Sequence, residues 1–372
     1  MRRLSADGTA LHVFVTSLAY TAPMPSATST PDPVGRMDEL IYVDDGQPGF
    51  RRVRCGKGFS YRDLAGKPIR DRKVLERIRA LAIPPAYTRV WICSDPCGHL
   101  QATGRDARGR KQYRYHPRWN AQRGLAKFDH IIEFGESLPR LRRRSQRDLR
   151  LPGLPRDKVL ALLVRLLDGT LLRVGNDCYA RANHSYGLTT LRSRHFRAHR
   201  GRLRFVFRGK SGQQRDVELD DARLLGIVRR VQQLPGQRLF QYVDDDGQAQ
   251  AVESGMLNRY IQSACGASDD RAFSAKDFRT WGATVHAAGV LADEPLPEAG
   301  DESGRKARIA RAVAEVAAVL GNTPAVCRSA YIHPRVISGW LDGSLQRMVP
   351  AGVSGHPRKL EKAVQRFLRR RR

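Results

Sequence analysis

The sequence contains no run of 18 or more apolar residues, so no segment is predicted to span a membrane. Cysteine is also scarce, and its six copies show no disulfide framework. The pair Cys93 and Cys97 has neither a second pair nor a histidine at zinc-finger spacing, so it does not indicate a zinc site. We therefore expect the cysteines to be reduced and buried, as suits a cytoplasmic protein.

Motifs that bind nucleotides or metal ions are missing as well. The segment Gly209-Lys210-Ser211 resembles the end of a phosphate-binding loop, but the first glycine of that motif would fall at Arg204. No helix is expected to follow, so this interpretation fails, and an ordinary exposed turn lysine is one alternative for Lys210. The sequence predicts no metal ion and no cofactor.

Acidic residues are too few to balance the basic ones. The sequence has 37 Asp and Glu but 66 Lys and Arg, which gives a net charge of +29. Such an excess favours a polyanionic partner, with a membrane surface or a merely solvated basic face as alternatives. At 372 residues, 41% of them hydrophobic, the chain is long and apolar enough to bury a large core. Its length predicts a globular protein of two domains.

The composition changes along the chain and suggests three parts. Residues 1–36 are rich in Pro, Ser and Thr and are expected to be a disordered leader. Residues 11–19 faintly resemble a signal peptide, but secretion fits poorly with so basic a chain. Short β-rich segments then predict an N-terminal domain over 37–117, and helical periodicity predicts a second domain over 118–372 with a basic tail.

One segment of the β-rich part has the composition of a nucleic-acid contact. Residues 104–117 are expected to form a loop that interleaves glycines, cations and two tyrosines. Cations reach phosphates, while aromatic side chains and glutamine can approach bases or sugars; a flexible solvated loop is the alternative. The candidate DNA contacts in it are Arg105, Arg110, Lys111, Gln112, Tyr113 and Tyr115.

A tyrosine near the C-terminus lies just before a proline break. The apolar spacing over 309–320 predicts a helix that ends at Gly321, and Thr323 with Pro324 predicts the start of another. Tyr331 follows shortly before His333 and Pro334, where a side chain can point away from the core. Most of the 11 tyrosines must be packing or surface residues, so Tyr331 gains weight only from other residues upstream.

Five residues stand in an order that is typical of one enzyme family. They are Arg173, Lys210, Arg279, Asn322 and Tyr331. Arg173 lies in Leu-Arg-Val-Gly-Asn, Lys210 on a predicted β-hairpin, and Arg279 in Lys-Asp-Phe-Arg-Thr-Trp. With the N-terminal segments 83–93 and 98–115, this set resembles the bacterial and poxvirus-like type IB DNA topoisomerases over residues 38–345.

The resemblance implies an α+β protein that forms a clamp around double-stranded DNA. A small β-rich lobe would face a larger, mainly helical catalytic domain of the tyrosine recombinase and topoisomerase IB type. Such an enzyme relaxes positive and negative supercoils through a transient 3′-phosphotyrosyl bond, without ATP or metal. A monomer on DNA, located in the cytoplasm at the nucleoid, is expected.

The resemblance also implies roles for the five residues. Tyr331 would be the nucleophile, Arg173 and Arg279 would hold the phosphate, and Lys210 would be the general acid. Asn322 stands where many relatives have histidine; its amide can donate one hydrogen bond but cannot carry a charge. Tyr179, like Gln112, matches a DNA-contacting position.

Two alternative functions remain at this point. A tyrosine site-specific recombinase shares the fold and the chemistry, but recombinases usually have His-x-x-Arg where this chain has Lys276 before Arg279. A non-catalytic nucleoid DNA-binding protein would tolerate the loss of Tyr331 or Arg279, and both are present.

Overall fold

The computed structural model describes residues 40–266, 272–296, 298 and 300–370, without the side chains of residues 121, 122, 125 and 179. The predicted leader, 1–36, and the last two residues of the basic tail lie outside the described residues. Contacts within the chain divide the described part into an N-terminal unit, up to Lys127, and a C-terminal unit from Phe128 onward. The predicted boundary between 117 and 118 falls at the start of α2, Pro117–Asp148, and the domain limits stay a prediction.

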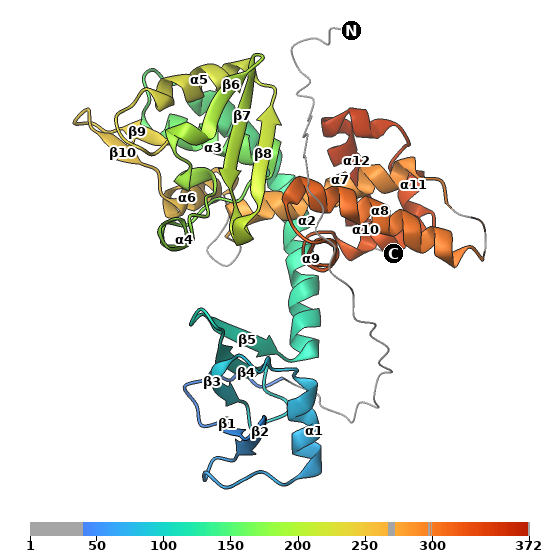
Figure 1. Cartoon of the computed structure of the whole chain (residues 1–372). Helices are drawn as coiled ribbons and strands as arrows, with labels where there is room; N and C mark the ends of the chain where they lie inside the picture. Colours follow the sequence, from blue (N-terminus) through green and yellow to red (C-terminus); the bar gives the residue numbers. More distant parts are fainter. Residues whose placement is uncertain (1–39, 267–271, 297, 299, 371–372) are drawn as a thin grey trace. The chain divides into compact units, whose positions relative to one another are not determined.

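The N-terminal unit is an antiparallel sheet with one helix packed on it (Figure 1). Its strands have the order β2-β1-β3-β4-β5. Ile78 of the helix packs with Val90, Ile92 and Ala102 of the sheet, and together they form a small core. The elements are β1 Phe50–Cys55, β2 Gly58–Arg62, α1 Arg72–Ala80, β3 Thr88–Ile92, β4 Leu100–Arg105 and β5 Lys111–Tyr115.

The segment 104–117 is not the loop that the sequence suggested. Half of it belongs to the antiparallel strands β4 and β5, in which Thr103 pairs with Tyr113 and Arg105 with Lys111. Only the connection between these strands is a turn, and Asp106 organises it by accepting hydrogen bonds from the backbone of Arg108 and Arg110. The many glycines and charged residues of this segment obscured the alternation of apolar and polar residues that indicates a strand.

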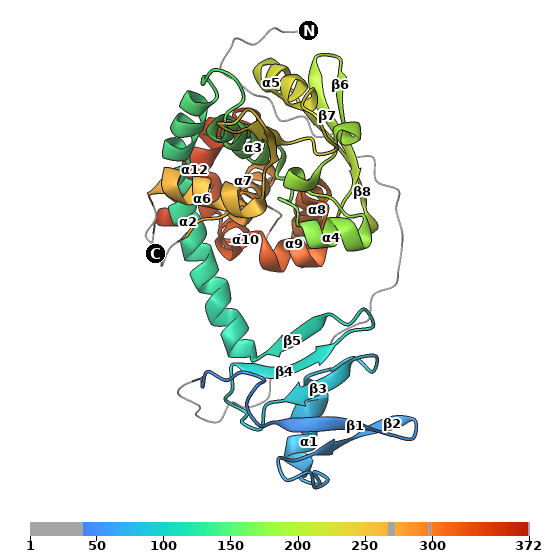
Figure 2. The same cartoon turned by 90° about the vertical axis from the view of Figure 1, so that its left-hand side faces the viewer.

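The C-terminal unit is mainly helical and carries a three-stranded antiparallel sheet in the order β6-β7-β8 (Figure 2). The strands are β6 Phe196–His199, β7 Arg202–Arg208, β8 Gln214–Leu219 and the separate hairpin β9 Gln241–Val243 with β10 Ala249–Ala251. The helices are α3 Arg156–Thr170, α4 Asp177–Asn183, α5 Ala222–Gln232, α6 Ser254–Cys265, α7 Ala275–Asp293, α8 Glu302–Leu320, α9 Pro324–Ala330, α10 Pro334–Leu341, α11 Ser344–Met348 and α12 Pro357–Arg369. Short 3-10 turns lie at Leu188–Thr190, Ser193–His195, Lys210–Gly212 and Val353–Gly355. The predicted α+β class is confirmed.

The core of this unit surrounds α3 and α7. In α3, ten of the residues from Lys158 to Thr170 are buried. This burial on all sides explains why the sequence of the helix is an almost continuous apolar run. In α7 the buried set includes Phe278, Arg279 and Trp281, so a charged side chain enters the core beside aromatic ones. A buried charge needs partners, and those of Arg279 define the site described below.

A buried ion network attaches the last helix to this core. Arg142 of α2 donates to Asp168 of α3 at 2.7 Å and to Glu361 of α12 at 3.0 Å. Trp281 of α7 donates its indole N–H to the same Glu361 at 2.7 Å. Burial alone would raise the pKa of Asp168, but the guanidinium of Arg142 outweighs it and keeps that pKa below its usual value.

Among the residues that the structure describes, no single helix has the length and apolar composition needed to cross a membrane. Helices α8 and α9 meet that requirement only when they are taken together across a bend of 94°.

Candidate active site

The bend between α8 and α9 places Tyr331. Helix α8 ends at Gly321, whose φ of +61° belongs to the left-handed region that glycine adopts most easily. Thr323 caps α9 by accepting a hydrogen bond from the backbone of Val326, and Pro324 is the first residue of that helix. Tyr331 follows the last residue of α9, so the helix boundaries predicted for this segment are confirmed.

The backbone around Tyr331 is fixed from α7. The hydroxyl of Thr284, which is fully buried, donates to the carbonyl of Tyr331 at 3.1 Å and accepts from the backbone N–H of His333 at 3.1 Å. Because Arg279 lies little more than one turn earlier on the same helix, α7 holds both Tyr331 and the arginine that faces it.

Arg173 reaches the same place from the segment after α3. That helix ends at Leu171 in the left-handed conformation. The chain then runs beside residues 187–189, where the carbonyl of Arg173 accepts from the N–H of Leu188 at 2.8 Å. A Cβ on Gly187 would lie 2.7 Å from that carbonyl oxygen, so only glycine allows the two segments to approach so closely.

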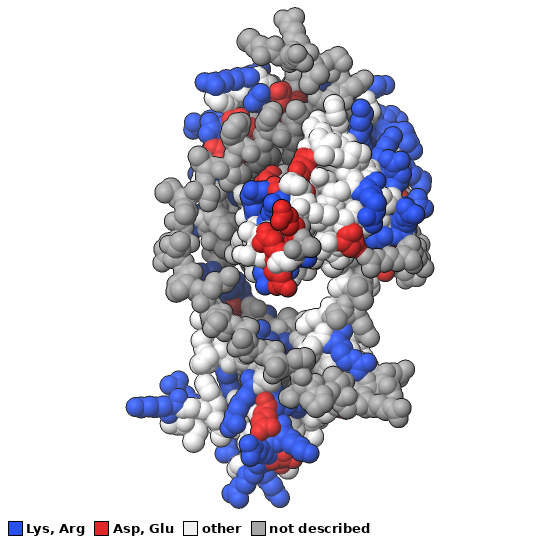
Figure 3. Space-filling model, turned by 90° about the vertical axis from the view of Figure 1, so that its right-hand side faces the viewer, with Lys and Arg blue, Asp and Glu red and all other residues white. Residues whose placement is uncertain are grey.

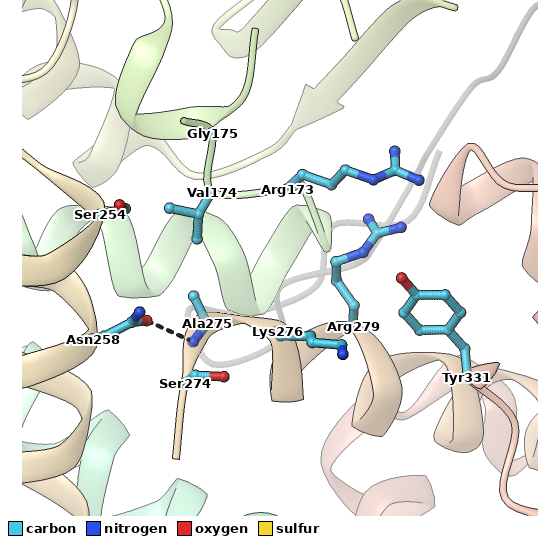
Figure 4. A pocket seen from close by; sticks show the side chains of 10 residues that line it. All are labelled: Arg173, Val174, Gly175, Ser254, Asn258, Ser274, Ala275, Lys276, Arg279 and Tyr331. Atoms are coloured by element: carbon cyan, nitrogen blue, oxygen red, sulfur yellow. Dashed lines mark hydrogen bonds between the residues drawn. The ribbon is translucent and has the colours of Figure 1, made fainter. Parts of the chain in front are cut away.

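Arg173, Arg279 and Tyr331 line one open hollow of about 340 Å³ (Figure 4). The Tyr331 hydroxyl points toward the two guanidinium groups, and the Arg279 guanidinium carbon lies 5.3 Å from the centre of the tyrosine ring. Among the described residues that line this hollow, none is acidic. The remaining lining residues are Val174, Gly175, Ser254, Asn258, Ser274, Ala275 and Lys276.

The charges of the hollow favour an anion. Burial, followed by the nearby Arg173, lowers the pKa of Arg279 to about 10. Burial also lowers the pKa of Arg173. Burial alone would raise the pKa of Tyr331, but the charge and hydrogen bond of Arg279 and the charge of Arg173 outweigh it and lower that pKa. Two cations placed beside a phenol of lowered pKa can stabilise both a phosphate and an attacking phenolate.

Asn322 joins this group through Arg173. Its side-chain oxygen accepts a hydrogen bond from the Arg173 guanidinium, which leaves the amide nitrogen, Nδ2, as a donor. Nδ2 is buried and has no hydrogen-bond partner among the described residues, and the same holds for Nε of Arg279. Buried donors without partners are rare, so these two are candidates to bind a ligand oxygen.

Lys210 lies apart from these residues. It begins the turn between β7 and β8, its side chain is exposed, and Ser211 and Gly212 both adopt positive φ, at +62° and +77°. The turn agrees with the predicted hairpin, but Lys210 is not among the residues that line the hollow. The structure therefore brings together Arg173, Arg279, Asn322 and Tyr331, and leaves Lys210 at the surface.

The candidate DNA contacts of the N-terminal unit lie on β4, β5 and their turn. Tyr113 and Tyr115 are 47% and 36% exposed, and their rings stack with centres 6.0 Å apart. The polar residues beside them are held in place by hydrogen bonds: Arg105 to Gly109 O, Arg110 and Gln112 to Asp106, and Lys111 to Asp45. Tyr179 belongs to α4 of the other unit, and its side chain lies outside the described part.

Sequence reasoning passed over two residues near the hollow. Lys276 lines it from the first turn of α7 and is exposed, although the sequence had marked it only as a difference from recombinases. Lys276 precedes Arg279 by three residues, and side chains with this spacing are neighbours on a helix surface. The sequence could therefore have indicated that Lys276 lies near Arg279. Arg215 of β8 is buried and reaches the end of α8, but nothing in its sequence context distinguishes it from other strand arginines.

Comparison with known proteins agrees with this arrangement. Residues 116–341 match the catalytic core of eukaryotic DNA topoisomerase I, and residues 58–106 match the N-terminal domain of bacterial DNA topoisomerase IB. DNA topoisomerase 1B of Acanthamoeba polyphaga mimivirus is 34% identical over 289 residues, which cover 76% of this chain and 85% of the relative.

These matches define the class as DNA topoisomerases of type IB. The chain belongs to this family, and it is therefore an isomerase that acts on DNA. The interpretations as a recombinase or as a non-catalytic nucleoid protein are not supported.

Proposed function

We propose that Tyr331 is the nucleophile with which this topoisomerase cuts one strand of double-stranded DNA. The observation that carries this assignment is the Tyr331 hydroxyl facing two guanidinium groups in a hollow whose described lining has no carboxylate. Their positive charge lowers the pKa of the phenol and increases the fraction of reactive phenolate at neutral pH.

The cleavage step exchanges one ester bond for another. The Tyr331 phenol loses its proton to solvent, and its oxygen forms a bond to phosphorus as the bond from phosphorus to the 5′-oxygen breaks. The 5′-oxygen leaves with a proton, and a 3′-phosphotyrosyl bond remains. Resealing reverses both changes, so no energy from ATP is needed, and the free 5′ end can rotate to release supercoils of either sign.

Arg173, Arg279 and Asn322 stabilise the charge that develops on the phosphate. The two guanidinium groups face the nonbridging oxygens, and Asn322 adds the neutral donor Nδ2, which is buried and has no partner among the described residues. Each such donor contributes about 3–4 kcal/mol to transition-state stabilisation. Lys276, at the rim of the same hollow, adds a further cation. Together these groups supply the charge that a metal ion provides in other phosphoryl-transfer enzymes.

Lys210 supplies the proton to the 5′-oxygen. Lysine suits this role because its ammonium group can release a proton, which arginine does not do in a protein. Its position on an exposed turn with two residues of positive φ allows the lysine to approach once DNA is bound. The lysine regains its proton when the 5′-hydroxyl attacks during resealing.

The N-terminal unit contributes further contacts to the duplex, and one chain acts as a monomer on DNA. Support comes from the exposed tyrosines of β5 and the cations beside them. In the face shown in Figure 3, Lys and Arg side chains lie on each of the two units. A chain of this charge is expected at the nucleoid.

Relaxation of supercoiled plasmids tests this function. With EDTA present and ATP absent, we expect the enzyme to relax positively and negatively supercoiled plasmid alike, because arginines and the covalent bond replace metal and nucleotide. A strict requirement for Mg²⁺ or ATP, or activity on one sign only, would refute the proposed mechanism.

A further inference from the structure

Arg215 is a buried arginine that the mechanism above does not use. It lies in β8 opposite Phe207 of β7, and its side chain is only 6% exposed. Its guanidinium leaves the sheet and reaches the end of α8, where Nη2 donates to the carbonyl of Val319 at 2.7 Å and Nη1 to that of Ala318 at 3.5 Å. Both terminal nitrogens of the guanidinium therefore donate hydrogen bonds to backbone carbonyls.

Arg173 and Arg279 use the next two carbonyls of the same helix end. Arg279 donates to Leu320 O at 3.0 Å, and Arg173 donates to Gly321 O at 3.2 Å. Four consecutive carbonyls, from Ala318 to Gly321, thus accept hydrogen bonds from three arginines. The C-terminal end of a helix carries a partial negative charge, which offsets the repulsion within this group of cations. Burial and the charge of Arg173 both lower the pKa of Arg215, which shows how closely the cations are crowded.

Gly321 makes this approach possible in two ways. It adopts a φ of +61° to end the helix, and a Cβ at this position would lie only 2.1 Å from Nη1 of Arg215. The next residue is Asn322, and α9 then leads to Tyr331. The position of Arg215 is therefore fixed against the junction that carries the nucleophile.

The other end of Arg215 touches the turn that carries Lys210. A Cβ on Gly209 would lie 3.1 Å from Cγ of Arg215, so the stem of the arginine is in close contact with the residue just before Lys210. Gly209 also donates its N–H to Gln213 O at 2.7 Å, which closes the turn. A single side chain thus spans the distance between the Lys210 turn and the end of α8.

We propose that Arg215 is a positioning residue that holds the Lys210 turn in register with the α8–α9 junction, so that the general acid meets the oxygen expelled by Tyr331. This inference rests on the proposed function, in which Lys210 is the acid. Arg215 does not line the hollow, so it acts through Lys210 and not on the phosphate.

The test compares two DNA substrates in single-turnover cleavage. One has an ordinary phosphodiester and the other has sulfur at the bridging 5′ position, which leaves without a proton. We expect Arg215→Met to slow cleavage of the ordinary substrate by roughly 10²-fold, as a misplaced catalytic group does. On the sulfur substrate this defect should largely disappear, because the acid is no longer needed. An arginine that serves only to cap α8 would lower stability and would not distinguish the substrates.

Arg204→Met is the matched control. Arg204 lies on the same hairpin but pairs with Asp216 at 2.6 Å and does not contact α8 in any described interaction. Its loss should change cleavage of either substrate by no more than about twofold, as for most surface substitutions. Gly209→Ala is the second variant, since it keeps the cap on α8 but adds a methyl group between the turn and Arg215. At φ −93° alanine is unstrained, and we expect a loss of roughly three- to tenfold on the ordinary substrate alone.

Lys210→Ala separates failure of this inference from failure of the proposed function. If its defect is equal on both substrates, Lys210 is not the acid and the proposed function is wrong at that step. If its defect disappears on the sulfur substrate while those of Arg215→Met and Gly209→Ala persist there, the positioning role alone is refuted. Should Arg215→Met fail to fold, Gly209→Ala decides the question by the same comparison.

Discussion

At the scale of single residues, the main feature of the site is the contact between a tyrosine and two arginines that are themselves held by backbone carbonyls. Burial opposes ionisation of Tyr331, and the neighbouring guanidinium charges more than compensate for it. Arg279 is 4% exposed and bonded to Leu320 O, so its position is set before any DNA arrives. A site prepared in this way needs little reorganisation during the reaction.

The pH dependence of cleavage should report this contact. The phenolate is the reactive form, so the rate of single-turnover cleavage should rise with pH and level off above the pKa of Tyr331. Because Arg173 helps to lower that pKa, Arg173→Met should move the rising part of the profile to higher pH. The loss of one phosphate donor should also reduce the rate by roughly 10²–10³-fold. An unchanged profile with only a lower plateau would show that Arg173 does not act on the phenol.

At the scale of helices and strands, the attachment of α12 is the feature with the clearest energetic consequence. Arg142, Asp168, Glu361 and Trp281 come from four different helices, and the side chains of Arg142 and Glu361 are only 13% and 15% exposed. Trp281 lies two residues after Arg279 on α7, so the same network supports the helix that carries a phosphate ligand.

Removing one member of this network should destabilise the C-terminal unit. Glu361→Ala leaves the buried Arg142 with one carboxylate fewer, which should cost about 3–5 kcal/mol. Glu302→Ala breaks an exposed pair with Lys306 and should cost no more than about 1 kcal/mol. Urea unfolding of both variants measures the difference, and equal small losses would contradict the importance of the network.

Some of these helices and strands could be predicted from the sequence, and others could not. Helical spacing together with Gly321 and Pro324 predicted the α8–α9 bend, because these signals are local. The hairpin that carries Lys210 was predicted for the same reason. The strands in 104–117 were missed, since glycine and charge hid their alternation. The contacts of Arg215 with Val319 and of Glu361 with Arg142 join residues more than a hundred positions apart, which no local pattern records.

At the scale of the whole molecule, the charge of +29 governs the interaction with DNA. Cations that neutralise phosphates release bound counterions, so the affinity falls as salt rises. Some of the cations are already paired within the protein, for example Lys111 with Asp45 at 2.6 Å. The slope of the salt dependence therefore counts phosphate contacts and not total charge.

Binding to a short duplex should weaken steeply with salt. For roughly 6–10 phosphate contacts we expect a loss of about 10³–10⁵ in affinity between about 50 and 200 mM salt. Arg105→Ala, which removes a candidate phosphate contact of β4, should reduce the slope by about one, whereas Arg72→Ala, which removes the same charge from α1, should leave it unchanged. A flat dependence in fluorescence anisotropy would contradict binding through the phosphates.

The central claim, that Tyr331 is the nucleophile, is tested most directly by trapping the covalent complex. The enzyme is incubated with an end-labelled duplex, denatured and separated, and the labelled peptide is identified by mass spectrometry. Tyr331→Phe should bind DNA normally and leave no covalent complex, whereas Tyr242→Phe, which changes a half-buried tyrosine of β9, should form it fully. A covalent complex that persists in Tyr331→Phe, or a label on another tyrosine, would contradict the assignment.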